Sequence, residues 1–249
     1  MFKNERESKI YDYLEKQKSA TVKELSELLY ISESSIRRDL ANLEKKGLIM
    51  RSYGGAEIIS SSTKVLPFST RSYDYIAEKQ MIASKAVSLI NEGDIVFLDQ
   101  SSTSYFLARS MINMSGVTVI TNNLEILSLL CGCGMNVHSS GGIISRANTN
   151  CLIGNNAQRT FEEVYADISF FSARALSSDG VISDYTQEEI FVRNSMLKNA
   201  DKKVFLCNSA KFNTHSAYKQ CTLSDVDYFI SENSDNQKFS LSFPNLNIL

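Results

Sequence analysis

The residues best suited to ligand chemistry follow an apolar segment at 95–98, which we predict to be a buried strand. The next six residues, 99–104, read DQSSTS and lead directly into a predicted helix. A helix N-terminus offers free backbone N–H groups and the positive end of the helix dipole, and hydroxyl side chains add donors. Capping the helix, the alternative role, needs only one hydroxyl. We therefore expect a phosphate site made by Asp99, Ser101, Ser102, Thr103 and Ser104.

Small polar residues, glycines and a lysine also follow the next predicted strands, at 117–120, 136–139 and 203–206. Two adjacent glycines allow close approach of a ligand to the backbone, or they simply form a turn. A lysine after a strand either meets an anionic ligand or lies on the surface. The further candidates for ligand binding are Thr121, Asn122, Asn123, Gly141, Gly142 and Lys211.

A different chemistry is indicated near the N-terminus, in a predicted helix from Ser32 to about Lys46. Ile36, Leu40 and Leu43 form its buried stripe, so polar side chains occupy the opposite face. Arginine and serine there suit the major groove of DNA, and a lysine and an arginine further on suit phosphates. A solvated charged helix is the alternative. The candidates for DNA contact are Ser34, Ser35, Arg37, Arg38, Asn42, Lys45 and Arg51.

The elements around this helix predict a winged helix-turn-helix domain at residues 1–59. A helix at 5–18 precedes a second helix that begins at Thr21, where Glu24 completes a capping-box pattern. Gly47 ends the third helix, and two short strands at 48–51 and 56–59 enclose a glycine-containing turn. Three short helices and a hairpin are the parts of that fold.

The remainder of the chain predicts a larger α/β domain at 75–249, joined to the head by a polar linker at 60–74. From residue 75 onward, helices alternate with short apolar strands. Such alternation favours a mainly parallel, Rossmann-like sheet, in which ligands bind at the carboxyl ends of the strands.

Composition excludes several classes of protein. No stretch approaches the roughly 18 apolar residues of a membrane span, and the charged N-terminal residues do not resemble a signal peptide. We therefore expect a soluble, cytoplasmic protein. The five cysteines lack the spacing of a zinc site and are expected to be reduced thiols, with no metal and no cofactor. The net charge of −2 decides nothing about DNA, because local placement of charge matters more.

The head resembles that of the DeoR family of bacterial regulators. Segment 32–40 reads SESSIRRDL and segment 51–56 reads RSYGGA, close to the family's patterns S-x-x-T-I-R-R-D-L and R-x-x-G-G-A. Ser35 stands where threonine is usual and keeps the hydroxyl.

Six segments in and just before the larger domain carry a recognisable pattern: Arg71 with 79–83 (KQMIA), 99–104 (DQSSTS), 121–123 (TNN), 141–142 (GG), 189–193 (EIFVR) and 209–212 (SAKF). With these segments the larger domain resembles the DeoR sensor domain, which is similar in fold to ribose-5-phosphate isomerase and glucosamine-6-phosphate deaminase. In those folds the Ser/Thr loop holds the phosphate. Two positions depart from the family pattern, since Ser101 replaces a glycine and Asn208 replaces an aspartate.

These observations predict a DNA-binding transcriptional regulator, a repressor of sugar-metabolism genes controlled by a phosphorylated sugar. Its partners are expected to be operator DNA, the sugar phosphate and further copies of itself, as a dimer or tetramer. The alternative is a sugar-phosphate isomerase or deaminase-like enzyme with an accessory head, although neither His138 nor His215 is tied to the loop. A scaffold whose winged helix binds protein is a third interpretation.

Overall fold

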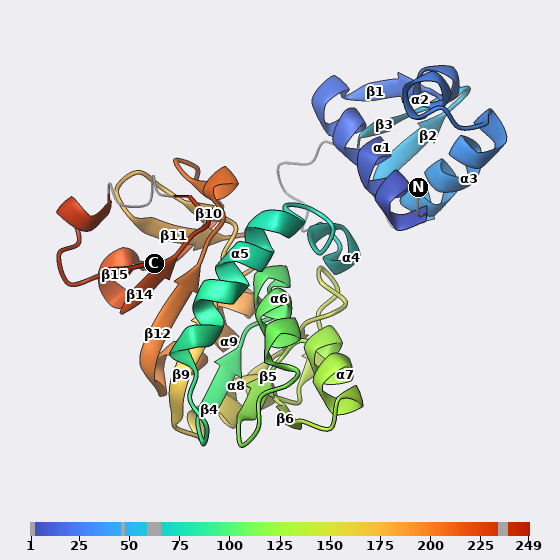
Figure 1. Cartoon of the computed structure of the whole chain (residues 1–249). Helices are drawn as coiled ribbons and strands as arrows, with labels where there is room; N and C mark the ends of the chain where they lie inside the picture. Colours follow the sequence, from blue (N-terminus) through green and yellow to red (C-terminus); the bar gives the residue numbers. More distant parts are fainter. Residues whose placement is uncertain (1–2, 46–47, 59–65, 234–238) are drawn as a thin grey trace. The chain divides into compact units, whose positions relative to one another are not determined.

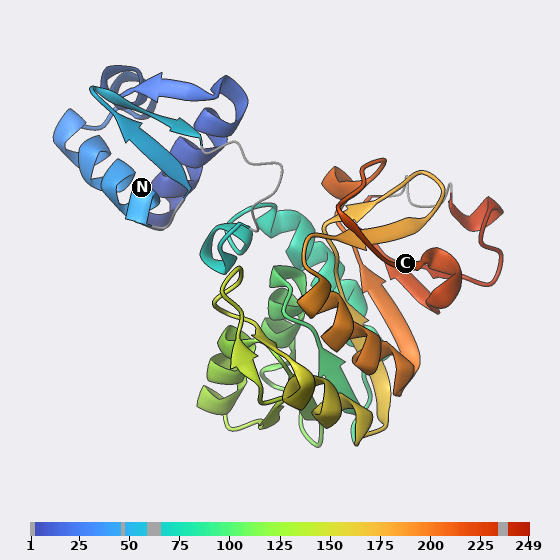
Figure 2. The same ribbon diagram turned by 180° about the vertical axis from the view of Figure 1, so that it is seen from behind.

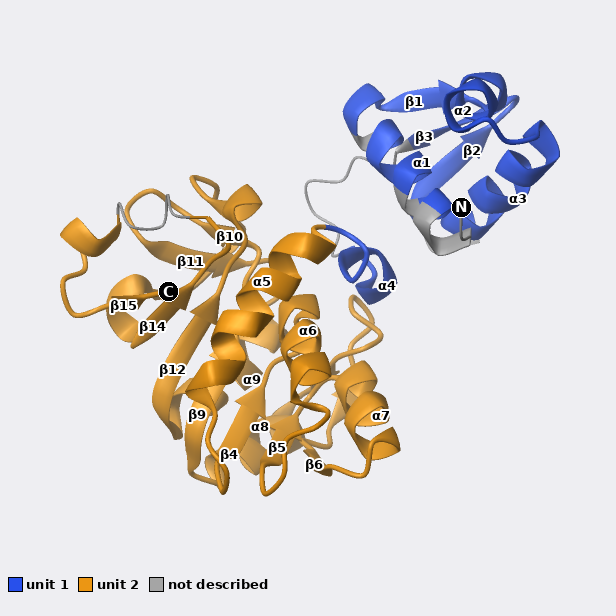
Figure 3. Cartoon of the chain, viewed as in Figure 1, with its two compact units in different colours: residues 1–74 blue, residues 75–249 orange. Residues whose placement is uncertain are grey.

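The computed structural model describes residues 3–45, 48–58, 66–233 and 239–249. The chain divides into two compact units, Met1–Asp74 and Tyr75–Leu249 (Figure 3). The predicted end of the third helix (46–47), the last residue of the predicted strand at 56–59 and part of the predicted linker (60–65) lie outside the described residues. In the rest of that linker, Phe68–Arg71 form a short helix, α4.

The first unit is a winged helix-turn-helix, as predicted. Thr21 caps the second helix with the expected capping box, in which its hydroxyl accepts the N–H of Glu24 and the Glu24 carboxylate accepts the N–H of Thr21. Its sheet has the order β1-β3-β2 and is antiparallel; β1 was not predicted. The elements are α1 (Lys3–Gln17), β1 (Ser19–Thr21), α2 (Val22–Leu29), α3 (Glu33–Lys45), β2 (Ile49–Ser52) and β3 (Gly55–Ile58).

The core of the head joins its helices to the sheet. The predicted stripe of α3, Ile36, Leu40 and Leu43, is buried and packs with Ile10 and Leu14 of α1 in one apolar cluster. Because these residues recur at helical spacing, burying them fixes which face of α3 remains outside. That face carries most of the residues predicted to contact DNA.

The second unit is built on a seven-stranded sheet with the order β15-β14-β12-β9-β4-β5-β6, and all its strand pairs are parallel (Figure 1). The chain runs outward from β4 through β5 to β6, and then returns to β9 on the other side of β4. This change of direction places a topological switch point between β4 and β9, where open α/β sheets bind ligands. The strands are β4 (Ile95–Leu98), β5 (Thr118–Thr121), β6 (Asn136–Ser139), β9 (Ala166–Phe171), β12 (Ala200–Leu206), β14 (Tyr228–Ile230) and β15 (Asn247–Ile248).

Helices cover both faces of this sheet (Figures 1 and 2). Successive side chains of a strand point to opposite faces, so Val96 and Leu98 pack against α5, α6 and α7, while Phe97 packs against α8 and α9. The mainly parallel, Rossmann-like architecture predicted for this unit is therefore confirmed. The helices are α5 (Ile76–Ala86), α6 (Ser102–Met111), α7 (Leu124–Gly132), α8 (Asn155–Glu162) and α9 (Gln187–Lys198), with a 3₁₀ turn η1 (Val87–Leu89) after α5.

Two small antiparallel sheets were not predicted. The strands β10 (Ala175–Leu176), β11 (Val181–Asp184) and β13 (Tyr218–Thr222) form one sheet in the order β10-β11-β13. The strands β7 (Ile143–Ile144) and β8 (Leu152–Ile153) form the other. The strands β7, β8 and β10 have two residues each, too few for an alternating pattern to be recognised in the sequence. We call β10-β11-β13 the small sheet.

Candidate functional site

The N-terminal half of α3 presents the predicted base-reading side chains to the outside. Ser34, Arg37 and Arg38 are exposed, and Ser35 is half-buried. The Arg37 guanidinium pairs with Glu33 at 2.9 Å within the same helix, where both side chains are at least half exposed. Such exposed pairs contribute little to stability, so the Arg37 guanidinium can exchange this carboxylate for another acceptor.

The Asn42 side chain is half-buried and contacts α1. Its amide nitrogen donates to Glu7 Oε1 of α1 at 3.1 Å, and Glu7 is buried. One turn earlier, Asp39 is also buried and accepts the guanidinium of Arg6. Asp39 and Asn42 therefore both face α1, because side chains three positions apart lie on the same side of a helix.

The cations predicted to contact phosphate are Lys45 at the end of α3 and Arg51 in β2, the first strand of the β2–β3 hairpin that forms the wing. Arg51 donates both its backbone N–H (3.1 Å) and its Nε (2.6 Å) to the Glu44 carboxylate. These hydrogen bonds lower the pKa of Glu44. Lys45 is the last residue of α3, and its side chain lies outside the described part of the structure.

In the second unit, α6 begins at the predicted phosphate loop. Ser101 is its N-cap, and the Ser101 hydroxyl accepts the N–H of Ser104 at 3.0 Å. Within the described residues, neither the backbone N–H nor the hydroxyl of Ser102 or Thr103 forms a hydrogen bond, although both side chains are buried. We call Ser101–Ser104 the cradle. It offers two free N–H groups at the positive end of a ten-residue helix.

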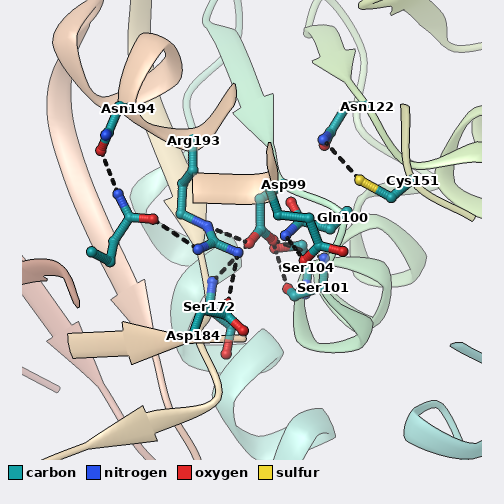
Figure 4. A network of polar contacts seen from close by, with 12 residues as sticks. Asp99, Gln100, Ser101, Ser104, Asn122, Cys151, Ser172, Asp184, Arg193 and Asn194 are labelled. Carbon is teal, nitrogen blue, oxygen red and sulfur yellow. Dashed lines mark hydrogen bonds and ion pairs between the residues drawn. The ribbon is translucent and has the colours of Figure 1, made fainter. Parts of the chain in front are cut away.

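Asp99 shapes the cradle from the end of β4. Its Oδ1 accepts the N–H of Ser101 (3.0 Å) and the hydroxyl of Ser104 (2.7 Å), while its Oδ2 accepts the N–H of Ser172 (3.1 Å) (Figure 4). The side chain is fully buried. Asp99 was predicted as a ligand-binding residue. In the structure its carboxylate is buried and orders the cradle through its hydrogen bonds to Ser101 and Ser104.

The residues after β5 form a second layer of anchored polar groups. Thr121 Oγ1 accepts the N–H of Asn123, and Asn123 Oδ1 caps α7 by accepting the N–H groups of Glu125 and Ile126. Asn122 donates from Nδ2 to the carbonyl of Leu152 at 3.1 Å. Each amide is thus fixed through one end. Its other end, Asn122 Oδ1 or Asn123 Nδ2, is buried and has no partner among the described residues.

Gly141 and Gly142 are exposed and lead into β7. Gly142 has a φ of +103°, and a Cβ at this position would lie 2.5 Å from the carbonyl oxygen of Ile153. Glycine is therefore required there by the packing of the β7–β8 hairpin. This structural requirement accounts for Gly142 without a ligand, whereas a Cβ at Gly141 would meet nothing within 4 Å.

Lys211 comes to the same edge of the sheet as the cradle. It lies in the 3₁₀ turn η2 (Ser209–Lys211) after β12, and its Nζ donates to Ser172 Oγ at 2.9 Å. Ser172 follows β9 and is itself bonded to Asp99 through its N–H. Lys211 therefore lies with Ser172 and Asp99 near the switch point between β4 and β9. Gly141 and Gly142 instead lead into the β7–β8 hairpin.

Two family models match the chain. A DeoR-like helix-turn-helix domain matches residues 6–62, and a DeoR C terminal sensor domain matches residues 74–233, which is more than half of the chain. The chain belongs to the DeoR family.

Curated relatives of this DeoR-family chain cover nearly its whole length. The HTH-type transcriptional regulator GolR of Listeria innocua is 32% identical over 98% of this chain and 96% of the relative. The lactose phosphotransferase system repressor of Staphylococcus aureus is 30% identical (96% and 95%), and the HTH-type transcriptional repressor GlcR of Bacillus subtilis is 28% identical (96% and 92%). A regulator of transcription is thus the common description.

Solved structures resemble this chain more distantly. Ribose 5-phosphate isomerase A of Methanocaldococcus jannaschii aligns with a TM-score of 0.41 and 18% identity, over 54% of this chain and 53% of the isomerase.

No helix in the described residues has the length and apolar character of a membrane span.

Sequence reasoning did not assign a role to two side chains that the DeoR sensor domain buries beside its loop. Glu189 and Arg193 of α9 are 4% and 1% exposed, and they hold Gln100 and Asp99 respectively. An acidic and a basic residue four positions apart are typical of an exposed helix face. The available signal was the flanking pattern of Ile190, Val192 and Met196, which marks most of this helix as buried.

Proposed function

We propose that this DeoR-family regulator is a repressor of sugar-metabolism genes, whose affinity for operator DNA is controlled by a phosphorylated sugar bound at the cradle. The observation that carries the proposal is the pair of free N–H groups of Ser102 and Thr103 at the start of α6. Unpartnered N–H groups and the helix dipole together favour an anion. Their position at the carboxyl end of β4, beside the switch point of the sheet, is where such folds bind ligands.

The surroundings of the cradle support a phosphorylated polyol. Lys211 supplies a positive charge at the neighbouring strand end, 2.9 Å from Ser172 Oγ. Asn122 Oδ1 and Gln100 Oε1 are buried acceptors with no partner among the described residues, and such groups are suited to the hydroxyls of a sugar. The names of two relatives, a lactose phosphotransferase system repressor and the repressor GlcR, support sugar control and repression.

For DNA binding we propose the exposed start of α3 and the wing. Arg37 and Arg38, with the hydroxyls of Ser34 and Ser35, would read bases in the major groove. Lys45 and Arg51 would hold phosphates. Asn42 is left out of the interface, because Glu7 holds its amide against α1.

We assign these functions to the predicted domains: DNA binding to the head at 1–59 and effector sensing to the domain at 75–249, with a linker at 60–74. Because one small head recognises too short a site, we propose a dimer or tetramer on paired half-sites. A regulator of this kind acts where the chromosome lies, so we place it in the cytoplasm.

A catalytic role is not favoured by the groups around the cradle. Acid–base chemistry needs a carboxylate or histidine free to move a proton. The Asp99 carboxylate is taken up by Ser101, Ser104, Ser172 and Arg193, and both oxygens of Glu189 accept side-chain amides. We therefore propose a binding domain and not an isomerase or deaminase.

The experiment is a thermal-shift screen of the full chain against sugar phosphates, each paired with its unphosphorylated sugar. A ligand at 100 times its dissociation constant adds about 2.7 kcal/mol to the stability of the native state. We expect one phosphorylated sugar to raise the melting temperature, and its unphosphorylated form to leave it unchanged. Equal shifts of the melting temperature with both forms would contradict a role for the phosphate group in binding.

A further inference from the structure

The buried face of α9 carries opposite charges one turn apart, at Glu189 and Arg193. Their side chains bind two consecutive residues of the β4–α6 loop. Glu189 Oε2 accepts Gln100 Nε2 at 2.8 Å, and Arg193 Nε donates to Asp99 Oδ2 at 3.3 Å (Figure 4). The loop that ends at the cradle is thus held by one helix through two polar contacts.

The other side of the Arg193 guanidinium is held by the small sheet. Its Nη2 donates to Asp184 Oδ2, at the end of β11, at 3.1 Å, and its Nη1 donates to Gln220 Oε1, in β13, at 2.9 Å. Burial works against the charge of Arg193, but the nearby carboxylates of Asp184 and Asp99 raise its pKa overall. The guanidinium therefore stays charged and bridges Asp99 to two strands of the small sheet.

Glu189 makes an equivalent connection on the other side of the loop. Its second oxygen, Oε1, accepts Nδ2 of Asn148 at 3.0 Å. Asn148 lies in the segment between β7 and β8 and is buried. The Glu189 carboxylate thus connects the loop to the β7–β8 hairpin.

Asp99 is the point at which this network acts on the cradle. One of its oxygens accepts Arg193 and the N–H of Ser172, and the other orders Ser101 and Ser104. A rotation of the Asp99 carboxylate would change the N-cap of α6 and the direction of the free N–H groups. Because side chains in a protein interior are close-packed, a displacement of the small sheet cannot be accommodated by movement of Arg193 alone, and it also changes the position of Asp99.

We propose that Arg193 is a positioning residue of the effector site, which couples the geometry of the cradle to the position of the small sheet through Asp99 and Asp184. The inference rests on the proposed function, because it assigns the cradle as the site of the effector. The small sheet is then the part of the sensor domain that responds when the cradle is occupied.

The test removes a hydrogen bond between Arg193 and the small sheet, on the side of the guanidinium that does not contact the β4–α6 loop. Asp184→Ala removes one acceptor of the guanidinium without touching residues 99–104. The matched control is Asp179→Ala, an exposed aspartate of the β10–β11 turn that is bonded to Ser177. If Asp184→Ala fails to fold, Gln220→Ala removes the other remote acceptor, together with the hydrogen bond that Gln220 Nε2 donates to Asn194. Arg193→Lys keeps the charge but loses the planar fork.

Two readouts are measured on the full chain. The first is hydrogen exchange of the amides in residues 99–106 without any ligand. The second is the dissociation constant for inorganic phosphate, from thermal shifts at constant ionic strength. We expect Asp184→Ala to speed exchange in 99–106 more than elsewhere in the sensor domain, and to weaken phosphate binding by about fivefold or more. Asp179→Ala should change neither, and Arg193→Lys should weaken phosphate binding as well.

The outcomes separate this inference from the proposed function. Exchange in 99–106 that equals the wild type, or that rises uniformly over the whole sensor domain, overturns the coupling. If the wild type does not respond to phosphate or to any sugar phosphate, the proposed function fails. The coupling is then decided by the exchange measurement alone.

Discussion

Arg6 of α1 holds the buried carboxylate of Asp39 on α3 with two hydrogen bonds, one of them 2.9 Å long between Nη2 and Oδ1. The Asp39 side chain is 1% exposed, whereas Arg6 reaches the surface. The pair therefore joins the first helix of the head to the proposed recognition helix at the turn that precedes Asn42. It sets the rotation of α3, and with it the direction of Arg37 and Arg38.

Replacing Arg6 by methionine should loosen the head. The change leaves the Asp39 carboxylate buried without its charged partner, which costs roughly 1–3 kcal/mol. Hydrogen exchange of the amides of α1 and α3 in the full chain should become faster, and exchange in the sensor domain should not change. Lys23→Met is the control, because Lys23 pairs with Glu27 on an exposed surface. Equal effects of the two substitutions would contradict the account.

Replacing Arg38 by alanine should reduce sequence-specific DNA binding. Loss of a bidentate contact to a base costs about 1–3 kcal/mol of discrimination, which corresponds to a factor of about 5 to 150 in affinity. Fluorescence anisotropy with a duplex selected from a random pool measures this loss. The control is Arg159→Ala in α8, since Arg159 is also exposed and paired within its own helix. Unchanged affinity and specificity for Arg38→Ala would remove it from the interface.

Replacing Arg51 by alanine should weaken binding to all sequences alike. Arg51 forms an exposed pair with Glu44, and a DNA phosphate can take the place of that carboxylate. One phosphate contact fewer lowers the steepness of log K against log salt concentration by about 0.9. Titrations at several salt concentrations measure this slope. A loss of affinity confined to the selected duplex would instead indicate that Arg51 reads a base.

Gly142 and Gly134 offer a matched pair for the β7–β8 hairpin. Both have positive φ, but a Cβ at Gly142 would lie 2.5 Å from the Ile153 carbonyl, while a Cβ at Gly134 meets nothing within 4 Å. Alanine at either position costs conformational strain, and only Gly142→Ala adds a backbone clash. Thermal unfolding should show the larger destabilisation for Gly142→Ala. Equal losses would mean that the hairpin moves aside to accept the methyl group.

The cysteines should differ in reactivity. Burial raises the pKa of Cys207 to about 12, and that of Cys221 to about 12 as well, so neither thiol is ionised near neutral pH. Cys131 and Cys133 are exposed. Alkylation of the native chain at pH 8, followed by mass spectrometry, should modify Cys131 and Cys133 first. Early modification of Cys207 would contradict its burial.

Much of the fold could be predicted because it rests on repeated local patterns. The stripe of Ile36, Leu40 and Leu43, the capping box at Thr21 and the alternation of helices with apolar strands each depend on neighbouring residues. The small sheet could not be predicted in this way. Its strands are short, and β13 is separated from β11 by a whole helix and strand of the chain.

The candidate site was predicted as a set of loops but not as a network. The cradle follows from a strand that ends in hydroxyl residues before a helix. The role of Asp99 could not be predicted, because its partners Ser172 and Arg193 lie 73 and 94 positions away along the chain. The contact between Asn42 and Glu7 could not be predicted, because a helical projection does not show where α1 packs.

The central claim is that a sugar phosphate at the start of α6 changes DNA affinity, and Ser102→Pro tests it most directly. Proline suits the first residue of a helix and removes both the N–H and the hydroxyl. Ser101 already has the extended backbone, with ψ of 152°, that a residue before proline requires. Gln187→Pro is the matched control at the first residue of α9, where Thr186 is also extended.

Binding of the selected duplex is titrated with and without the sugar phosphate that stabilises the wild type. The account predicts that this sugar phosphate changes the DNA affinity of the wild type and of Gln187→Pro by about 5- to 150-fold, and leaves that of Ser102→Pro unchanged. A full response from Ser102→Pro would contradict the account and place the effector away from the cradle.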